Sequence, residues 1–339
     1  MATISVGILG LGRLGTSFGL ALKRYSARKD ARQQFSITGY DTTDNANIAK
    51  SKNAVDTTTR SVVDAAADKD IVILTLPYRE VQAAYRAVGQ DVRPGAVVLD
   101  VSPLKLPSQL WSEKHLRADA YALGITPILT PAYLSDGLDD AEHAAADLFE
   151  KGTMLLMPHP KCAKEAVELA ADFAELLGAT AHFADPAEHD VWVAATEGIP
   201  AALGVAAFYS LQRSDGWNDA QRAGNPAFGR LTRHLYDTHP DDLRDMLLNN
   251  RDNVVRQIDS TIETLRIVRD VLAQNDQKAL EGLLIDSAET YAQWVGRRQR
   301  GEWDDRDPQV KRESSGEQLM TGLFGSKLSK RLRREKDDE

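Results

Sequence analysis

Three glycines near the amino terminus have the spacing of a phosphate-binding turn. The segment Gly10–Gly15 reads GLGRLG, a G-x-G-x-x-G, and follows directly on the short β-branched run at residues 3–9. In such a turn the first glycine makes a tight bend, the second lets the backbone approach a pyrophosphate, and the third lets helix and strand pack closely. The helix that follows would offer free N–H groups and its positive dipole end to the phosphates. The spacing predicts a dinucleotide site that includes Gly10, Gly12, Arg13, Leu14 and Gly15.

A carboxylate at the end of the second predicted strand indicates which dinucleotide binds. The strand at residues 35–40 is followed by Asp41. An acidic residue there accepts hydrogen bonds from the ribose hydroxyls of the adenosine, and its charge repels a 2′-phosphate. Thr42 and Thr43 come next, with no Arg or Lys beside them to receive that phosphate. A helix N-cap or turn role is the alternative for Asp41. We therefore expect NAD(H), with NADP(H) the less favoured cofactor.

Apolar runs alternate with helical patterns through the first half of the chain. Residues 71–76 and 96–99 are continuous apolar runs that end at Pro77 and Asp100. Further strands are predicted at 122–125, 153–157 and 180–183. This alternation predicts an α/β fold with a parallel, doubly wound sheet of the Rossmann type, whose ligands lie beyond the carboxyl ends of the strands. We expect Pro77, and the segment after Asp100, at the nicotinamide end of the site.

The second half of the chain is helical in pattern. A long, Ala-rich apolar helix is predicted over residues 185–211, and further helices over 241–273 and 277–295. An all-helical domain with a long apolar helix often dimerises through its apolar faces, so we expect a homodimer. The predicted organisation is a Rossmann domain at 1–184, an all-helical substrate and dimerisation domain at 185–300, and a polar basic tail at 301–339.

The tail beyond Gly301 is polar, and we expect it to be mobile. It nevertheless places apolar residues at helical spacing beside Lys and Arg residues. Two interpretations stay open. One is a basic amphipathic helix that lies on a membrane surface or docks on a partner. The other is a solvated tail, or a helix packed on its own dimer.

Composition argues against several classes of function. A length of 339 residues predicts two domains. The net charge of −9 argues against a general nucleic-acid binder, because contacts with phosphates need a basic face. Cys162 is the single cysteine, which leaves no intrachain disulfide or cysteine metal cluster, and the histidines lack the paired spacing of a metal site. No continuous apolar run approaches the roughly 20 residues that span a bilayer. The apolar residues 1–9 are followed at once by glycines, unlike a signal peptide, so we expect a cytoplasmic enzyme.

The order of these motifs resembles the prephenate/arogenate dehydrogenase family, within the 6-phosphogluconate-dehydrogenase-like group of two-domain oxidoreductases. The similarity extends from residue 3 to about residue 295. The segments that carry it are GLGRLG at 10–15, GYD at 39–41, DIVILTLP at 70–77, DVSPLK at 100–105 (the family's D-x-x-S-x-K), EHD at 188–190 followed by Ile199-Pro200, FGRLTR at 228–233 and NR at 250–251.

The resemblance implies an activity and a substrate class. Family members oxidise prephenate or arogenate with NAD(P)+ in tyrosine biosynthesis, taking hydride from the ring carbon that bears the hydroxyl while carbon dioxide leaves. The resemblance also implies that Arg233, in the Thr-Arg pair, binds a carboxylate of the small-molecule substrate. A guanidinium fork suits that task because it donates two parallel hydrogen bonds. An ordinary salt-bridging helix arginine is the alternative.

Several positions depart from the family's pattern. The candidates for its catalytic H-P-M segment are Thr126-Pro127 and Thr130-Pro131, and its H-x-P-H segment is GIPA at 198–201. Pro103 replaces the serine of D-x-x-S-x-K, although Ser102 is adjacent. A threonine can hydrogen-bond a hydroxyl but cannot take its proton near neutral pH as an imidazole can. Loss of a well-placed acid–base group costs about 10²–10⁴-fold in rate.

The remaining acid–base candidates are few. His189 lies between Glu188 and Asp190 on the predicted interdomain helix, where a purely structural hydrogen-bond network is the alternative. Lys105 follows a strand end, and a desolvated lysine there could exchange a proton with an oxygen; a solvated helix lysine is the alternative. Glu197 could act as a base if it is buried. The predicted set near the reacting carbon is Ser102, Lys105, Thr130 and His189.

Two rival hypotheses remain. A β-hydroxyacid dehydrogenase or imine reductase could share the two-domain plan, with the Thr-Pro segments and Glu197 as adaptations to another substrate. Alternatively, the chain could be a non-catalytic NAD-binding regulator that has lost its acid–base residues. NADH formation from prephenate, arogenate or hydroxy acids separates these hypotheses.

Overall fold

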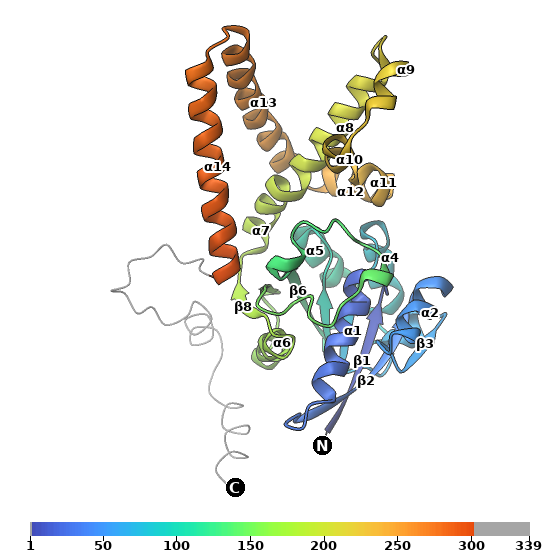
Figure 1. The fold of residues 1–339 in the computed structure, drawn as a ribbon. Helices are drawn as coiled ribbons and strands as arrows, with labels where there is room; N and C mark the ends of the chain where they lie inside the picture. Colours follow the sequence, from blue (N-terminus) through green and yellow to red (C-terminus); the bar gives the residue numbers. More distant parts are fainter. Residues whose placement is uncertain (1, 302–339) are drawn as a thin grey trace. The chain divides into compact units, whose positions relative to one another are not determined.

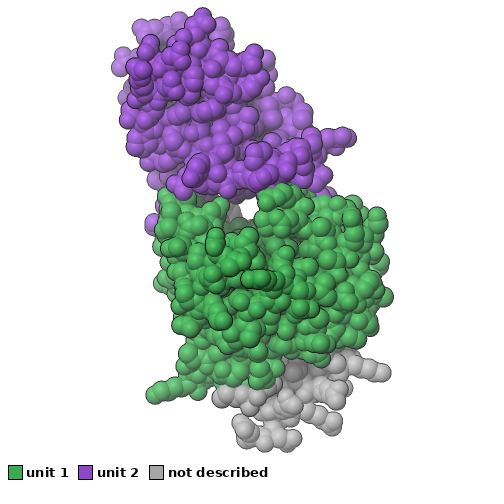
Figure 2. Space-filling view, turned by 90° about the vertical axis from the view of Figure 1, so that its right-hand side faces the viewer, with its two compact units in different colours: residues 1–102, 108–185, 304–339 green, residues 103–107, 186–303 purple. Residues whose placement is uncertain are grey.

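The computed structural model describes residues 2–301, so the predicted tail lies almost wholly outside the described residues. The described chain divides into two compact units (Figure 2). Unit 1 comprises residues 2–102 and 108–185. Unit 2 comprises residues 103–107 and 186–301. The short segment 103–107 therefore belongs to the helical unit although it follows a strand of unit 1.

Unit 1 is built on one eight-stranded sheet with the order β3-β2-β1-β4-β5-β6-β7-β8 (Figure 1). The strands are β1 (Ala2–Leu9), β2 (Gln33–Tyr40), β3 (Thr57–Thr59), β4 (Ile71–Leu74), β5 (Val97–Asp100), β6 (Tyr121–Ile128), β7 (Thr153–Pro158) and β8 (Thr180–Phe183). The predicted α/β fold is confirmed. The chain leaves β1 for β2 on one side and returns to β4 on the other, which makes the β1/β4 boundary the switch point where such sheets bind ligands.

The sheet is parallel as predicted except at one pair, since β6 and β7 run antiparallel. Parallel neighbours need a crossover, usually a helix. The segment between β6 and β7 contains only two short 3-10 turns, Pro131–Tyr133 and Ala141–His143, so the chain turns back instead. The three-residue edge strand β3 was not predicted, because its sequence is three threonines without an apolar pattern.

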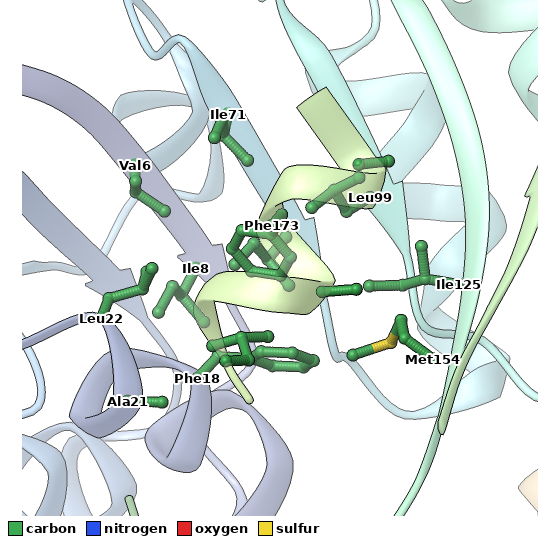
Figure 3. Close-up of a cluster of buried hydrophobic side chains, with 14 of the residues drawn as sticks. Val6, Ile8, Phe18, Ala21, Leu22, Ile71, Leu99, Ile125, Met154 and Phe173 are labelled. Atoms are coloured by element: carbon green, nitrogen blue, oxygen red, sulfur yellow. The ribbon is translucent and has the colours of Figure 1, made fainter. Parts of the chain in front are cut away.

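Helices pack on the sheet of unit 1 around a continuous apolar core. They are α1 (Arg13–Ser26), α2 (Thr43–Ser51), α3 (Val62–Ala66), α4 (Tyr78–Val88), α5 (Lys105–His115) and α6 (Lys164–Leu176). Figure 3 shows Phe18 of α1 and Phe173 of α6 beside Ile8, Leu99 and Ile125 of the sheet. The rings of Phe18 and Phe173 are 5.8 Å apart between centroids. Burying each such side chain contributes about 1.5–3 kcal/mol, and this cluster fixes α1 against the strand that precedes it.

Unit 2 is entirely helical within the described residues. Its helices are α7 (Pro186–Val193), α8 (Ile199–Gln212), α9 (Trp217–Ala220), α10 (Pro226–Thr232), α11 (His234–Asp237), α12 (Pro240–Asn249), α13 (Arg251–Ala273) and α14 (Gln277–Arg300). The two long helices α13 and α14 run side by side (Figure 1). The helix predicted over 185–211 is interrupted by a π-helical turn, Ala194–Gly198. The helix predicted over 241–273 is broken at Asn250, whose buried side chain donates a hydrogen bond to the Asp190 carbonyl oxygen of α7.

One stretch of the described chain, Pro186–Gln212, is long and apolar enough to cross a bilayer by length and composition alone. The sequence expectation overlooked it because isolated polar residues interrupt the apolar run while the mean hydropathy stays high. The core helix of a soluble protein passes the same test, so this is weak evidence for a membrane span. Its α7 portion carries a buried carboxylate, Asp190.

Candidate active site

The glycine turn after β1 has the geometry that the motif predicts. Gly10 has φ +103°, and a Cβ there would lie 2.5 Å from the Thr75 backbone. A Cβ on Gly15 would lie 1.8 Å from the Gly10 carbonyl oxygen, so α1 can approach the turn only without a side chain. No atom lies within 4 Å of the Cβ position of Gly12. The turn is therefore closed by the first and third glycines and open for a ligand at the second.

A cavity of about 630 Å³ lies at this turn. Six of the seven predicted cofactor residues line it, namely Gly12, Arg13, Leu14, Gly15, Asp41 and Pro77. The seventh, Gly10, shapes the turn without lining the cavity. The sequence did not single out Asn45, Thr75, Arg60, Arg79 and Asp139, which also line it. The cavity lies at the β1/β4 switch point, where the fold class places dinucleotides.

Asp41 is held in place by the turn itself. Its carboxylate accepts hydrogen bonds from the backbone N–H groups of Leu11 and Thr42, and from Asn45 Nδ2 at 3.2 Å. The N-cap of α2 is Thr42, so Asp41 does not cap this helix. No Arg or Lys accompanies Thr42 and Thr43 in the sequence, but the cavity brings in a basic residue from elsewhere in the chain. Arg60, directly after β3, lines the same cavity because the unpredicted β3 pairs with β2.

Arg13 links the glycine turn to the long segment between β6 and β7. Its guanidinium donates to Asp136 through Nη1 at 3.0 Å and Nη2 at 2.5 Å, and to the Leu138 carbonyl oxygen. It also lies over the Tyr133 ring, 5.2 Å from the centroid. The side chain is 4% exposed, and its Nε has no hydrogen-bond partner. The hydrogen bond to Asp136 raises the pKa of Arg13 and lowers that of Asp136, so both groups stay charged.

Asp100, at the end of β5, organises the segment after it. One carboxylate oxygen accepts hydrogen bonds from Tyr85 Oη at 2.8 Å and from Ser108 Oγ. The other accepts from the backbone N–H of Ser102 at 2.8 Å, and Ser102 is itself buried. Burial raises the pKa of Tyr85, so its hydroxyl stays protonated and donates. From the sequence Asp100 was recognised only as a strand end, and its partners Tyr85 on α4 and Ser108 on α5 were not predicted.

Within unit 2, one carboxylate joins two predicted site residues. Asp190 accepts hydrogen bonds from the backbone N–H groups of Lys105 at 2.8 Å and Leu106 at 3.0 Å. Its Oδ1 also lies 3.1 Å from His189 Nδ1. The carbonyl oxygen of Asp190 accepts from Asn250 Nδ2 at 2.6 Å. The break between α12 and α13 thus supplies the amide that fixes the backbone of α7.

The His189 imidazole is buried, and burial lowers its pKa below the ordinary value of 6.5. The charge of Lys105 lowers this pKa further, and Asp190 opposes both effects. The imidazole is therefore neutral at neutral pH. Donation from Nδ1–H to Asp190 fixes the tautomer whose Nε2 carries the lone pair, the form that can accept a proton.

The remaining predicted residues have different surroundings. Thr130 is half-buried, and its backbone N–H donates to the Leu148 carbonyl oxygen at 3.0 Å. Arg233 pairs with Asp237 at 2.5 Å and its side chain is 49% exposed. Glu197 is exposed on the π-helical turn, which removes the burial that a general base would need. Within residues 2–301, no group of three or more His, Cys, Asp or Glu side chains could hold a metal ion.

A switch-point cavity, a glycine turn and an adjacent carboxylate, followed in the chain by an all-helical unit, define a two-domain, dinucleotide-dependent oxidoreductase. Two family models match this chain, one directly after the other. The prephenate dehydrogenase nucleotide-binding domain matches residues 18–183, and the prephenate dehydrogenase dimerization domain matches residues 185–285. The chain belongs to the prephenate dehydrogenase family, as its motifs predicted.

Characterised relatives and solved structures agree with that assignment. The prephenate dehydrogenase of Bacillus subtilis is 24% identical over 87% of this chain and 76% of its own length. The cyclohexadienyl dehydrogenase of Zymomonas mobilis is 22% identical over 80% of this chain and 89% of its own. A structure of A. aeolicus prephenate dehydrogenase with hydroxyphenyl propionate and NAD+ has a TM-score of 0.71 at 22% identity, covering 86% of this chain and 98% of that one. Synechocystis arogenate dehydrogenase has a TM-score of 0.63 at 18% identity, covering 86% of this chain and all of that one (100%). At these identities the structural likeness shows the fold.

Proposed function

We propose that this chain is an NAD+-dependent dehydrogenase that oxidises prephenate or arogenate and releases carbon dioxide. The observation that carries the proposal is the cavity between the open face of Gly12 and the fixed carboxylate of Asp41. A pyrophosphate can approach the backbone at Gly12, and Asp41 can receive the ribose hydroxyls. Family membership then supplies the substrate class.

Asp41 supports NAD+ as the preferred cofactor, because a 2′-phosphate would have to lie beside its charge. Arg60 and Arg79 line the same cavity and soften that repulsion. We therefore expect measurable but weaker use of NADP+.

The proposed reaction has a simple electron balance. Bound NAD+ supplies the hydride acceptor. The ring carbon that bears the hydroxyl loses a hydride, and the bond from the ring to its carboxylate breaks so that its electron pair completes the aromatic ring. The hydroxyl oxygen becomes the phenol oxygen and retains a proton in the product. A base is needed only to share that proton while the hydride leaves.

His189 is the residue that we propose for this base, in place of the histidine that the Thr-Pro segments lack. Its neutral imidazole is oriented by Asp190 through Nδ1, an arrangement that sets the tautomer and stabilises the imidazolium that forms. Because Asp190 also holds the backbone of Lys105 and Leu106, it keeps the imidazole and this segment in a fixed geometry. Arg233 is proposed as the group that binds a substrate carboxylate.

The direct test incubates the purified full chain with NAD+ or NADP+ and, separately, prephenate, arogenate and a panel of β-hydroxy acids. Growth of NADH absorbance together with release of carbon dioxide from prephenate or arogenate is the expected result. Reduction of NAD+ by hydroxy acids alone would favour the β-hydroxyacid dehydrogenase hypothesis. Cofactor binding with no turnover of any substrate would favour the regulator hypothesis.

We also propose that the chain forms a homodimer through unit 2. This unit matches a dimerization-domain model and carries large apolar side chains on exposed helix faces. On α13 and α14 these include Ile262, Leu265, Ile267, Leu284, Ile285 and Trp294. Light scattering should give twice the mass of the chain, and Leu265→Glu should shift it toward the monomer. A wild-type monomer at micromolar concentration would reject the proposal. The cytoplasmic location predicted from composition stays a prediction.

A further inference from the structure

The cavity at the glycine turn, which includes Gly12 and Asp41 in its lining, is called the dinucleotide cavity below. A second cavity, of about 200 Å³, lies in unit 1 at the opposite edge of the sheet. Its lining includes Tyr121, where β6 begins, and Lys161, just after the end of β7. The pairing of Leu123 with Pro158 brings these two strand ends together at the amino edge of the parallel strands. The dinucleotide cavity follows the carboxyl ends of β1 and β4, and the two cavities share no lining residue.

Part of the lining of this cavity is small and apolar, beside the buried hydroxyl of Ser112. Leu116, Ala120, Ala122 and the thiol of Cys162 contribute to it. Cys162 is 4% exposed, and its Sγ donates to the Ala122 carbonyl oxygen at 2.9 Å. Such a surface favours the hydrocarbon part of a ligand, because covering it removes apolar area from water.

Charged side chains contribute the more exposed part of the lining, which we call the mouth, and each permanent cation there has a carboxylate partner. Lys161 Nζ lies 3.0 Å from Glu113 Oε1, and His159 Nε2 lies 3.3 Å from the same oxygen. The backbone N–H of Lys161 donates to His159 Nδ1 at 3.1 Å, which fixes Nε2 as the protonated nitrogen that faces Glu113. Arg117 is held by Asp119 and by the Val92 carbonyl oxygen at 3.0 Å. The mouth thus contains two permanent cations, Lys161 paired with Glu113 and Arg117 paired with Asp119, and the Asp119 carboxylate itself does not line the cavity.

We propose that this cavity is a binding site for a small organic carboxylate with a short apolar body. The carboxylate would lie between Lys161 and Arg117, and the apolar body would cover the thiol of Cys162 and its alanine neighbours. Lys161 can turn toward a ligand because its side chain is 78% exposed and its ion pair with Glu113 is solvated. The proposal does not depend on the dehydrogenase reaction, since the two cavities are lined by different residues.

The single cysteine of the chain provides the measurement. Burial raises the pKa of Cys162 to about 11, so its alkylation by N-ethylmaleimide is slow and sensitive to what covers it. The alkylation rate of the full chain is measured by mass spectrometry with butyrate, benzoate, L-valine or inorganic phosphate added. At a ligand concentration about ten times Kd, a ligand that covers the thiol slows the reaction about tenfold. We expect this with one or more of the carboxylates and not with phosphate.

Variants locate the protection. Lys161→Glu and Ala118→Phe, which places a ring at the mouth, should each abolish it. Lys114→Glu is the matched control, because Lys114 is exposed on the same helix as Glu113 and does not line the cavity. Each variant is compared with itself in the absence of ligand. NAD+ is the control for general stabilisation and should leave the protection by the carboxylate in place.

Four outcomes would overturn the proposal. The first is an alkylation rate that no carboxylate changes, and the second is protection that survives in both Lys161→Glu and Ala118→Phe. The third is protection that disappears when NAD+ is bound, which would place the ligand in the dinucleotide cavity. Equal protection by phosphate is the fourth, because it would show a site for any anion rather than for an organic carboxylate.

Discussion

Arg13 and Asp136 are 123 positions apart in the chain and form a two-point ion pair beside the dinucleotide cavity. Arg13 belongs to the glycine turn, and Asp136 belongs to the segment that connects β6 to β7. The same segment contributes Asp139 to the cavity and carries Thr130. The ion pair therefore ties the wall of the cavity to the glycine turn, at which we propose that the pyrophosphate binds.

Breaking this pair should weaken cofactor binding. Arg13→Gln and Asp136→Asn should each raise the Kd for NAD+ about 10- to 100-fold, because a hydrogen bond to a charged group contributes about 1.5–3 kcal/mol. The double variant should be little worse than either single variant, since the two side chains act as one unit. Calorimetric titration gives the Kd values. Arg28→Gln, which removes an exposed pair with Asp30, is the control. Fully additive effects in the double variant would contradict the coupling.

Asp41 should govern the choice between NAD+ and NADP+. Asp41→Ser removes the charge that opposes a 2′-phosphate while keeping a hydroxyl for the Leu11 N–H. The ratio of kcat/KM values should shift toward NADP+ by roughly 10- to 100-fold, or about 1.4–2.7 kcal/mol. Adding Arg60→Gln should reverse much of this shift, because Arg60 lines the cavity and we assign it as the basic partner of the 2′-phosphate of NADP+. An unchanged ratio in Asp41→Ser would show that another residue sets the preference.

His189 should determine the acidic limb of the pH–rate profile. As a base it must be neutral, so activity should fall as the pH drops through its pKa in the folded protein, which burial places below 6.5. His189→Gln should lower kcat about 10²–10⁴-fold and remove that limb. Asp190→Asn should move the limb to lower pH, because the carboxylate favours the charged imidazole. A His189→Gln enzyme with the wild-type profile would exclude the role.

The same burial should make the free energy of unfolding depend on pH. The unfolded chain has the higher His189 pKa, so it binds more protons than the folded chain between the two pKa values. The contribution of the neutral, buried imidazole is fully present above about pH 6.5 and is lost as the pH falls toward the folded pKa. The slope is at most about 1.4 kcal/mol per pH unit. Urea unfolding of the wild type should show this slope, and His189→Gln should lack it; identical slopes would refute the assignment.

Arg233 should affect substrate binding more than the chemical step. Arg233→Lys keeps the charge and loses the two-point fork, so KM for the carboxylated substrate should rise about tenfold with kcat nearly unchanged. Stability should change little, because the exposed pair with Asp237 contributes about 0.3–0.5 kcal/mol. Steady-state kinetics and thermal melts measure both effects. Arg230→Lys, an exposed neighbour on α10, is the matched control, and equal KM values in the two variants would reject the role.

Short-range features of the site could be read from the sequence because neighbouring residues create them. The strand, the glycine turn and the start of α1 are consecutive, and Asp41 follows directly on β2. Their roles depend on local backbone geometry, such as the positive φ of Gly10. The strand β7 was predicted, but its antiparallel direction was not, because direction depends on how the connecting segment runs in space. The edge strand β3 was missed because it has no apolar pattern. Arg60, which directly follows β3 and lines the cavity, was not predicted for the same reason.

The long-range hydrogen bonds of Asp190 could not be predicted from the sequence. Its place beside His189 is visible in the sequence, but its hydrogen bonds to the Lys105 and Leu106 backbone span more than eighty positions. The break at Asn250 was not predicted either, and the hydrogen bond from its side chain to the Asp190 carbonyl oxygen joins residues 60 positions apart. The periodicity of apolar residues predicts which face of a helix is buried, but it does not predict hydrogen bonds between residues that are far apart in the chain.

By itself, then, the sequence determined the α/β and all-helical halves, the glycine turn and the family, since these depend on residue order and spacing within short windows. Tertiary structure alone decided which charges meet. It paired Arg13 with Asp136, brought Arg60 and Arg79 into the cavity that Asp41 lines, and buried His189 against Asp190. Pairing, burial and pKa arise from distances in space, which strand order and helix breaks set and which no local pattern encodes.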